Sequence, residues 1–209
     1  MTKNTVTVVD YGMGNICSVV SAFDYLGCEA FVANDPDQVA NADTLILPGV
    51  GSFRKAMACL RERELDRALS HAVLNRGRKI LGICLGMQLL GERGFEDGET
   101  SGLGLIPAAV ERFSVEEVGG SKIPHVGFNS VNVPPRSRLM AGLAAKADFY
   151  FVHSYRMLPD GLPGLAANCV YGIEFLAAYE QANIFATQFH PEKSQSNGLL
   201  LLKNFIECS

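Results

Sequence analysis

The first ninety residues alternate between short apolar runs and segments whose apolar residues recur at helical spacing. The first helical segment lies at 16–26, and a second one, rich in Arg and Glu, follows Ser52 and ends at Gly77. The apolar runs that predict strands lie at 5–9, 30–33, 44–47 and 79–83. Strands that alternate with helices form a parallel sheet covered by helices, because each parallel connection needs a crossover. The pattern therefore predicts an α/β fold.

The second half of the chain predicts further strands joined by short turns. Short turns join antiparallel neighbours, so we expect antiparallel additions to the sheet. A last helix is expected from about Asn197 to Glu207. The predicted strands are Ala108–Phe113, Val126–Val133, Phe149–Val152, Leu165–Val170, Phe175–Tyr179 and Ile184–Phe189. The expectation is a single domain over 1–209, with a mostly parallel central sheet flanked by helices.

Composition excludes several classes of partner. Of 209 residues, 48% are hydrophobic and 19% are charged, and the formal net charge is −4. A surface for nucleic acid or an anionic membrane would need a basic stripe, so we expect neither partner. The longest apolar stretch, 80–91, is shorter than the ~20 residues of a transmembrane helix, and no secretory signal is recognisable.

The six cysteines show no spacing typical of a zinc site or a disulfide framework. No CxxC pair occurs, and no histidine lies at ligand spacing. We therefore expect no metal and a reducing, cytoplasmic location, with most thiols acting as small buried hydrophobic groups. Gly12-Met13-Gly14 imitates a dinucleotide fingerprint but lacks its third glycine, so NAD binding is not expected.

One cysteine has a different context. Gly82-Ile83-Cys84-Leu85-Gly86 lies between an apolar strand and an apolar helix, which is the G-x-nucleophile-x-G pattern with Cys at the centre. A tight strand-to-helix turn leaves little room two residues before and after the nucleophile, so both positions become glycine. The helix N-terminus favours a thiolate and can bind an oxyanion. The alternative is a core cysteine between glycines of close packing.

A thiol nucleophile needs a base, and His190 is the best placed of the four histidines. It ends an apolar strand in Gln188-Phe189-His190-Pro191-Glu192. The residue before proline is held extended, and alternate side chains of an extended chain share a face. His190 and Glu192 can then point the same way, which predicts nucleophile, base and orienting carboxylate in Cys84, His190 and Glu192. Taken alone, His190 would be a hydrogen-bonded histidine at a strand end.

Pro48-Gly49-Val50-Gly51 follows another strand of the predicted parallel sheet. Open α/β sheets bind ligands at the carboxyl ends of their strands. Two glycines around Val50 would let a peptide rotate and direct an N–H group at developing negative charge. A plain structural turn is an equal alternative at this point.

These segments together resemble the class I, triad-type glutamine amidotransferases. The resemblance is carried by Leu81–Leu90 and by the His-Pro-Glu-Lys-Ser sequence at 190–194. Within the class, the chain is similar to the glutaminase subunits of imidazole glycerol phosphate synthase. The segments that carry this closer similarity are Asp10–Asn15, Pro48–Phe53, Pro124–Gly127, Tyr150–Tyr155 and 198–205.

The resemblance implies a flavodoxin-like fold and a function. It implies hydrolysis of L-glutamine through a Cys84 thioester, with His190 as base and Glu192 as its orienting residue. It also implies that ammonia passes to a (β/α)8-barrel cyclase subunit in a heterodimer, without metal or organic cofactor. The remaining positions that match are the oxyanion residues Gly49, Val50, Gly51 and Leu85, the glutamine-binding residues Gln88, His153, Ser154 and Tyr155, and the partner-facing residues Asn15, Phe128, Tyr150 and Lys193.

The sequence departs from the family at one partner-facing position. The family's usual Pro-His-Met-Gly-Trp-Asn segment reads Pro124-His125-Val126-Gly127-Phe128-Asn129, and the chain contains no Trp. Phenylalanine keeps the aromatic ring but lacks the indole donor. A paralogue that feeds ammonia to a sugar amidotransferase in surface-polysaccharide synthesis therefore stays open. A cysteine peptidase and a non-catalytic activator are the alternatives from other classes.

Overall fold

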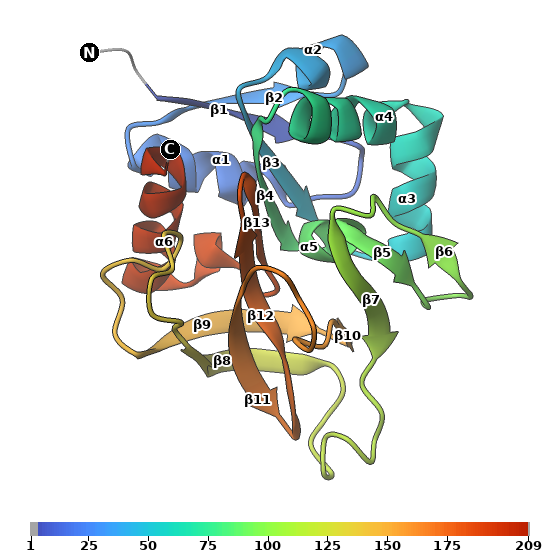
Figure 1. The fold of residues 1–209 in the computed structure, drawn as a ribbon, viewed down its shortest axis with the longest axis vertical. Coiled ribbons are helices and arrows are strands. Elements are labelled where there is room, and N and C mark those ends of the chain that lie inside the picture. The colour runs from blue at the N-terminus through green and yellow to red at the C-terminus, as the bar shows by residue number, and fades with distance from the viewer. Residues whose placement is uncertain (1–3, 209) are drawn as a thin grey trace.

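The fold is built on a nine-stranded sheet whose two halves differ in strand direction (Figure 1). The computed structural model describes residues 4–208. The strand order is β2-β1-β3-β4-β13-β12-β11-β8-β9, parallel from β2 to β13 and antiparallel from β13 to β9. The parallel strands are β1 (Thr5–Val9), β2 (Glu29–Ala33), β3 (Thr44–Gly49), β4 (Lys79–Cys84) and β13 (Ile184–Thr187), and the antiparallel ones are β8 (His125–Asn132), β9 (Lys146–His153), β11 (Leu165–Tyr171) and β12 (Ile173–Gln181). The predicted α/β class is confirmed.

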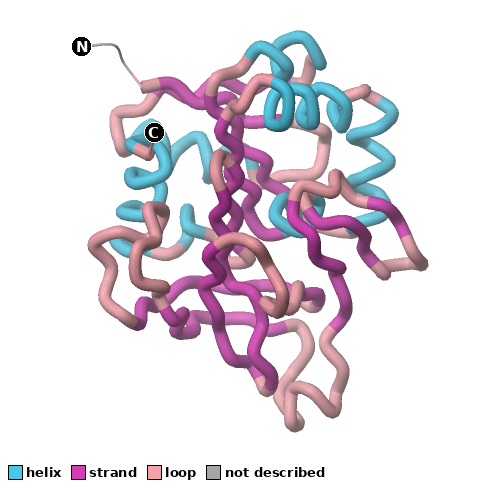
Figure 2. The backbone as a smooth tube through the Cα atoms, viewed as in Figure 1, coloured by secondary structure: helices cyan, strands magenta, loops and turns pink. Residues whose placement is uncertain are grey.

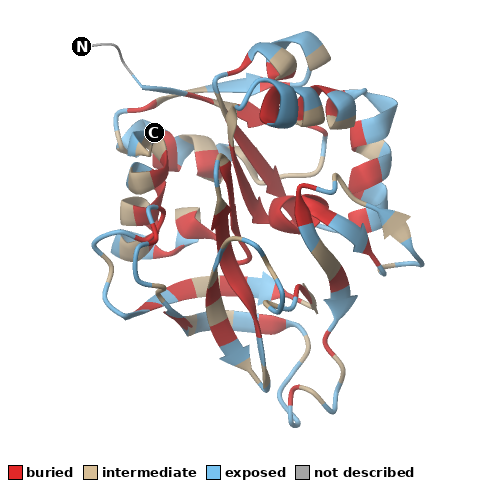
Figure 3. Ribbon diagram, viewed as in Figure 1, coloured by how far each residue is buried: buried red, intermediate tan, exposed pale blue. Residues whose placement is uncertain are grey.

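Helices cover both faces of the parallel half (Figure 2). Because side chains alternate across a strand, Leu45 packs on one side and Ile46 on the other, in two separate hydrophobic clusters. Figure 3 accordingly shows the central strands as buried. One face carries α1 (Ile16–Tyr25) and α6 (Gln195–Glu207), and the other carries α2 (Pro36–Asn41), α3 (Phe53–Glu62), α4 (Leu65–Ser70), the π-helical turn His71–Asn75 and α5 (Leu85–Leu89).

A second, four-stranded sheet corrects one prediction. The strand predicted at Ala108–Phe113 does not join the main sheet but forms β7 (Ile106–Arg112) of the order β10-β7-β5-β6. β7 is parallel to β5 (Gly91–Gly94) and antiparallel to β10 (Tyr155–Arg156), and β6 is Thr100–Ser101. The close pairing needs glycine, because a Cβ at Gly91 would lie 2.9 Å from the carbonyl oxygen of Ala108.

Three local features also differ from expectation. β13 pairs in parallel with β4, so it joins the two halves of the sheet instead of being an antiparallel addition. β3 continues through Pro48 and Gly49, which lie in register with Ile83 and Cys84. The unpredicted helix α2 begins after Asp35, whose carboxylate accepts the N–H groups of residues 37 and 38. Among the described residues, no helix combines the length and apolarity that crossing a membrane requires.

Candidate active site

Cys84 lies at the carboxyl end of β4, at the turn into α5. Its backbone has φ 55° and ψ −110°, a conformation that costs energy in a residue with a Cβ. Such strain is typical of a nucleophile held on a sharp strand-to-helix turn. Cys84 is 6% exposed, and its sulfur lies 3.9 Å from the carbonyl oxygen of Val152.

The two flanking glycines are required by close packing, as the sequence predicts. A Cβ at Gly86 would overlap the carbonyl oxygen of Leu47 on β3. A Cβ at Gly82 would lie 2.9 Å from the carbonyl carbon and oxygen of Gly86. The turn is therefore pressed against the neighbouring strand, and that contact fixes Cys84 relative to Gly49, with which it is in register.

His190 and Glu192 lie beside Cys84 in the expected mutual contact. His190 Nδ1 is 2.7 Å from Glu192 Oε1, and both side chains are almost fully buried. The backbone reaches this contact differently from the prediction. His190 itself is extended (φ −97°, ψ 98°), but Pro191–Lys193 forms a 3₁₀ turn, and this turn brings the carboxylate back to the ring. Hydrogen bonds from His190 N–H to Tyr150 O and from Tyr150 N–H to Ser194 Oγ hold the segment against β9.

The electrostatic environment favours a protonated His190. Burial lowers the pKa of the imidazole, but contacts with Cys84 and with the Glu192 carboxylate raise it by more, to about 9. The net shift is upward because both neighbours carry or develop negative charge. The imidazolium next to the sulfur is the proton-carrying group that a cysteine nucleophile needs.

A chain of amide contacts runs from the thiol into the protein. Gln188 Nε2 lies 3.8 Å from Cys84 Sγ, and Gln188 Oε1 accepts a hydrogen bond from Gln88 Nε2 at 3.0 Å. Gln88 Nε2 also lies 3.1 Å from the carbonyl oxygen of Tyr155. Gln88 was an expected substrate residue and Gln188 was not. Gln188 could have been found from its position two residues before His190, at the end of the same predicted strand, where alternate side chains share a face.

Cys84 opens into a cavity of about 330 Å³, a size suited to a small ligand. Its wall includes one charged residue that sequence reasoning missed. Glu96 accepts the N–H of Phe53 at the start of α3 through Oε2, at 2.7 Å. Glu96 lies in a segment rich in glycine and charged residues (94–102), and no sequence spacing links it to Cys84. The lining residues are Val50, Gly51, Cys84, Leu85, Gln88, Glu96, Pro124, Val152, His153, Ser154, Tyr155 and His190.

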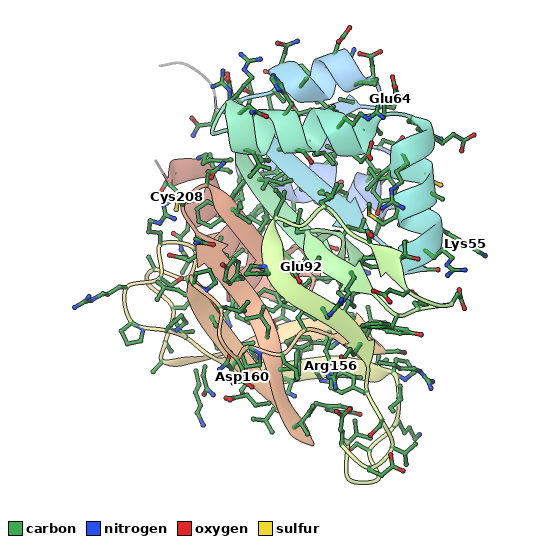
Figure 4. All side chains as sticks on the ribbon, turned by 45° about the vertical axis from the view of Figure 1, so that its right-hand side comes forward. Lys55, Glu64, Glu92, Arg156, Asp160 and Cys208 are labelled. Carbon is green, nitrogen blue, oxygen red and sulfur yellow. The ribbon has the colours of Figure 1, made fainter. Side chains whose placement is uncertain are left out.

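The far wall of the cavity is fixed by buried polar contacts. His153 Nδ1 lies 2.8 Å from the carbonyl oxygen of Tyr155, and its Nε2 lies 3.0 Å from His125 Nδ1. Since a carbonyl only accepts, His153 carries its proton on Nδ1, and His125 donates to His153. Burial lowers the pKa of His125 to about 4 and that of His153 to about 3, so both rings are neutral. Arg156 of β10, labelled in Figure 4, donates hydrogen bonds to Glu111 of β7 and to Glu117, and these bonds hold β10 in place.

The predicted oxyanion segment borders the cavity, but the Val50 N–H group already has a backbone acceptor. Val50 N–H donates to the carbonyl oxygen of Met13 at 3.2 Å, and Gly51 adopts φ 102°. The N–H group of Val50 is therefore directed at the turn after β1 and not at the sulfur. Leu85, the first residue of α5, follows Cys84 directly, and Gly49 ends β3 beside it.

The expected partner-facing residues lie on elements that adjoin one another. Phe128 on β8 pairs with Tyr150 on β9, with ring centroids 5.6 Å apart, and Phe128 is 51% exposed. Asn15 precedes α1 without a side-chain capping bond, and exposed Lys193 lies in the 3₁₀ turn beside β9 and α1. On the same exposed side, Val126 pairs with Val152, which also lines the cavity.

No group of three His, Cys, Asp or Glu side chains within residues 4–208 is arranged to hold a metal ion. The chemistry that the arrangement around Cys84 can perform is acyl transfer by a thiolate with an imidazole as proton carrier.

Comparison with known proteins identifies the family. Residues 7–208 match the family "Glutamine amidotransferase class-I". Imidazole glycerol phosphate synthase subunit HisH 1 of Campylobacter jejuni is 47% identical, over 96% of this chain and 98% of that protein. Subunit HisH of Geobacter sulfurreducens is 46% identical over 99% of each chain. The structure of PurLQS from Thermotoga maritima has the same fold, with a TM-score of 0.76, 19% identity and 99% coverage of both chains. The chain therefore belongs to the class I glutamine amidotransferases and, within that class, to the HisH subunits.

Proposed function

We propose that this chain hydrolyses L-glutamine to glutamate and ammonia through a thioester on Cys84. The observation that carries the proposal is the placement of the strained Cys84 turn against the His190–Glu192 pair, at the mouth of a cavity lined by amide and carboxylate groups. This is the arrangement of nucleophile, base and orienting group that acyl transfer requires.

In the first half-reaction the Cys84 thiolate attacks the side-chain amide carbon of glutamine. A C–S bond forms, the carbonyl π electrons move onto oxygen, and the resulting oxyanion is held by backbone N–H groups of Val50 and Leu85. When the oxyanion collapses, the C–N bond breaks and the imidazolium of His190 gives its proton to the departing ammonia. The raised pKa of His190 keeps this proton available at neutral pH.

In the second half-reaction neutral His190 removes a proton from water, which attacks the thioester carbon. Collapse of the second tetrahedral intermediate releases glutamate and restores the thiolate and the imidazolium. Glu192 carries no bond change in either step. It holds the imidazole by its Nδ1 and stabilises the positive ring.

Recognition of a free amino acid needs a partner for its α-ammonium group, and Glu96 is the carboxylate in the cavity wall. One of its oxygens is held by Phe53 N–H, which leaves the other for a ligand. Gln88, His153, Ser154 and Tyr155 supply amide, backbone and aromatic surfaces around the rest of the molecule.

We further propose that ammonia leaves toward a (β/α)8-barrel cyclase subunit that makes imidazole glycerol phosphate and AICAR in histidine biosynthesis. Direct transfer matters because ammonia in bulk water would be protonated and lose its nucleophilicity. Val152 supports the exit at this side, because it borders the cavity and belongs to the exposed apolar surface formed with Val126 and Phe128, next to the partly buried Tyr150.

A glutaminase that serves a sugar amidotransferase in polysaccharide synthesis is the second candidate. It is favoured by Phe128, an exposed residue on β8 at the expected partner-facing position, whose aromatic ring has no hydrogen-bond donor. The active-site chemistry of the two candidates is identical, so only the partner distinguishes them.

The test is glutamine hydrolysis by the purified chain, with and without a cyclase subunit and its nucleotide ligand, and with Cys84→Ala as the blank. Strong stimulation in the complex, absent from the variant, supports the glutaminase and the histidine-pathway partner together. Labelling of Cys84 by an electrophilic glutamine analogue without any stimulation keeps the glutaminase and rejects that partner. Absence of both rejects the proposed function.

A further inference from the structure

Tyr11 lies beneath the oxyanion segment, in the turn that follows β1. Its side chain is 1% exposed. A Cβ at Gly49 would overlap the Tyr11 hydroxyl oxygen, so only the absence of a side chain at Gly49 lets the two approach. The hydroxyl is thus in direct contact with the last residue of β3, on the strand beside Cys84.

This hydroxyl has no hydrogen-bond partner among residues 4–208, although it is fully buried. Burial, with a smaller contribution from nearby Cys84, raises the pKa of Tyr11 above its usual value, so the group remains a neutral O–H donor. A buried donor without an acceptor is destabilising, and such groups are uncommon in folded proteins. The isolated donor therefore needs an explanation.

The adjoining peptide supplies one. In this structure Val50 N–H donates to Met13 O, in the same turn as Tyr11. For Val50 N–H to reach an oxyanion on the substrate, the Gly49–Val50 peptide must rotate, and its carbonyl oxygen then turns toward the side that the N–H group has left. On that side lies the Met13 carbonyl, and two carbonyl oxygens that face each other repel. A donor placed there would remove the penalty.

We infer that Tyr11 is a positioning residue whose hydroxyl donates to the Gly49 carbonyl oxygen in the rotated state and so stabilises the complete oxyanion hole. The inference rests on the proposed function, because it concerns the hole used in glutamine hydrolysis. Tyr11 gains an acceptor in the rotated state just as Met13 loses its donor. The rotation then exchanges one backbone hydrogen bond for one side-chain hydrogen bond.

The test is Tyr11→Phe, which removes the hydroxyl and keeps the ring. In the complex with the partner and its ligand, kcat for glutamine should fall by about tenfold, less than loss of an oxyanion donor itself, while KM for glutamine stays unchanged. The thermal midpoint should stay equal or rise, because an unpaired buried hydroxyl has been removed. Exchange of the Val50 amide hydrogen in that complex should become slower, because the bond to Met13 persists.

The matched control is Tyr179→Phe, another tyrosine that is 1% exposed. Its hydroxyl donates to Gln181 Oε1 at 2.7 Å, remote from the cavity. This variant should lose stability and keep kcat, the opposite of Tyr11→Phe.

An unchanged kcat in Tyr11→Phe would overturn the inference, whatever happens to the thermal midpoint. So would a decrease in kcat that comes with a higher KM and a lower midpoint, since that combination indicates general damage to the site. If the wild-type chain hydrolyses no glutamine with any partner and its Cys84 is not labelled by the analogue, the proposed function fails and the inference with it.

Discussion

The ends of β4 and β3 differ in whether their groups are already arranged for catalysis. At the end of β4, Cys84 is fixed by contacts of its glycines, and beside it His190 and Glu192, which follow β13, already lie 2.7 Å apart. At the end of β3, one register position away from Cys84, the Val50 N–H group is bonded to Met13 instead of facing the cavity.

The difference separates two parts of catalysis. In the proposed mechanism, nucleophilic attack and proton transfer need Cys84 at the end of β4 and the His190–Glu192 pair after β13, whereas stabilisation of the oxyanion needs the Val50 N–H group after β3. A chain in which the nucleophile and base are in place but the oxyanion donor is not can bind glutamine without hydrolysing it. Coupling to a partner then needs only one peptide rotation, provided that the partner favours the rotated state.

The largest effect should come from removing the Cys84 thiol, which is already in place. Cys84→Ala should lower kcat for glutamine by roughly 10⁶-fold, because no thioester can form. Release of glutamate in the stimulated complex measures this loss. Cys17→Ala, which removes an exposed thiol, is the matched control and should leave the rate unchanged. Hydrolysis by Cys84→Ala above the blank would mean that another group attacks the amide.

The next effect concerns the orientation of the base. Glu192→Gln should lower kcat by roughly 10³–10⁴-fold, because the amide neither stabilises the imidazolium nor fixes the ring tautomer. The pKa of His190, raised to about 9 by Cys84 and the Glu192 carboxylate against the effect of burial, should decrease. Its decrease should appear in the pH dependence of Cys84 alkylation. A variant with the wild-type pH profile would show that Glu192 does not act on His190.

The donor at β3 can be removed without touching the triad. Val50→Pro deletes the N–H group and should lower stimulated kcat by about 10²–10³-fold, while the rate of Cys84 alkylation by iodoacetamide remains close to wild type. Val50→Ala keeps the N–H group and is the control. If Val50→Pro is stimulated as strongly as Val50→Ala, the rotating peptide is not part of the oxyanion hole.

The arrangement of Cys84 and His190 could be predicted because its causes are local in the sequence. Two glycines at fixed spacing and a strand-to-helix boundary determine the turn at Cys84, and a proline restricts His190. The state of Val50 could not be predicted, because it depends on a single hydrogen bond to Met13, 37 residues earlier in the chain. Both segments resemble the family, but only the geometry at Cys84 is determined by residues next to it in the sequence.

The fold divides in the same way. The parallel half follows from strong apolar runs that are buried on both faces. The second sheet was missed because β5, β6 and β10 have two to four residues, too few for a periodic pattern. Helix α2 was missed for a similar reason, although Asp35 and Pro36 form a recognisable start. Glu96 depended on the unpredicted sheet, whose β5–β6 connection brings it to the start of α3.

Glu96 tests whether recognition is independent of both strands. Glu96→Gln should raise KM for glutamine by about tenfold or more with little change in kcat, since a charge-assisted hydrogen bond contributes ~1.5–3 kcal/mol. The control is Asp97→Asn, because Asp97 accepts a hydrogen bond from Ser52 at 3.4 Å and does not line the cavity. Equal KM values for the two variants would reject Glu96 as the partner of the α-ammonium group.

The smallest expected effect is on the pH dependence of stability, to which His190 and the neutral pair His125 and His153 contribute with opposite signs. Because the folded-state pKa of His190 is raised to about 9, its contribution to stability is complete below pH 6.5 and is lost as the pH rises through about 9. His125 and His153 have the opposite sign. Burial lowers their pKa values to about 4 and about 3, so the unfolded chain binds more protons, and stability decreases as the pH falls from 6.5 toward 4.

His125→Phe should therefore reduce the loss of stability between pH 7 and pH 5, measured by urea unfolding at each pH. The phenyl ring can keep the stack on Tyr171, where the His125 centroid lies 4.0 Å away. At pH 7 the variant should be less stable by ~1–3 kcal/mol, because His153 Nε2 loses its donor. His71→Ala, at an exposed position, is the control. An unchanged pH dependence in His125→Phe would place the acid sensitivity elsewhere and leave the pair as a neutral support for the Tyr155 carbonyl.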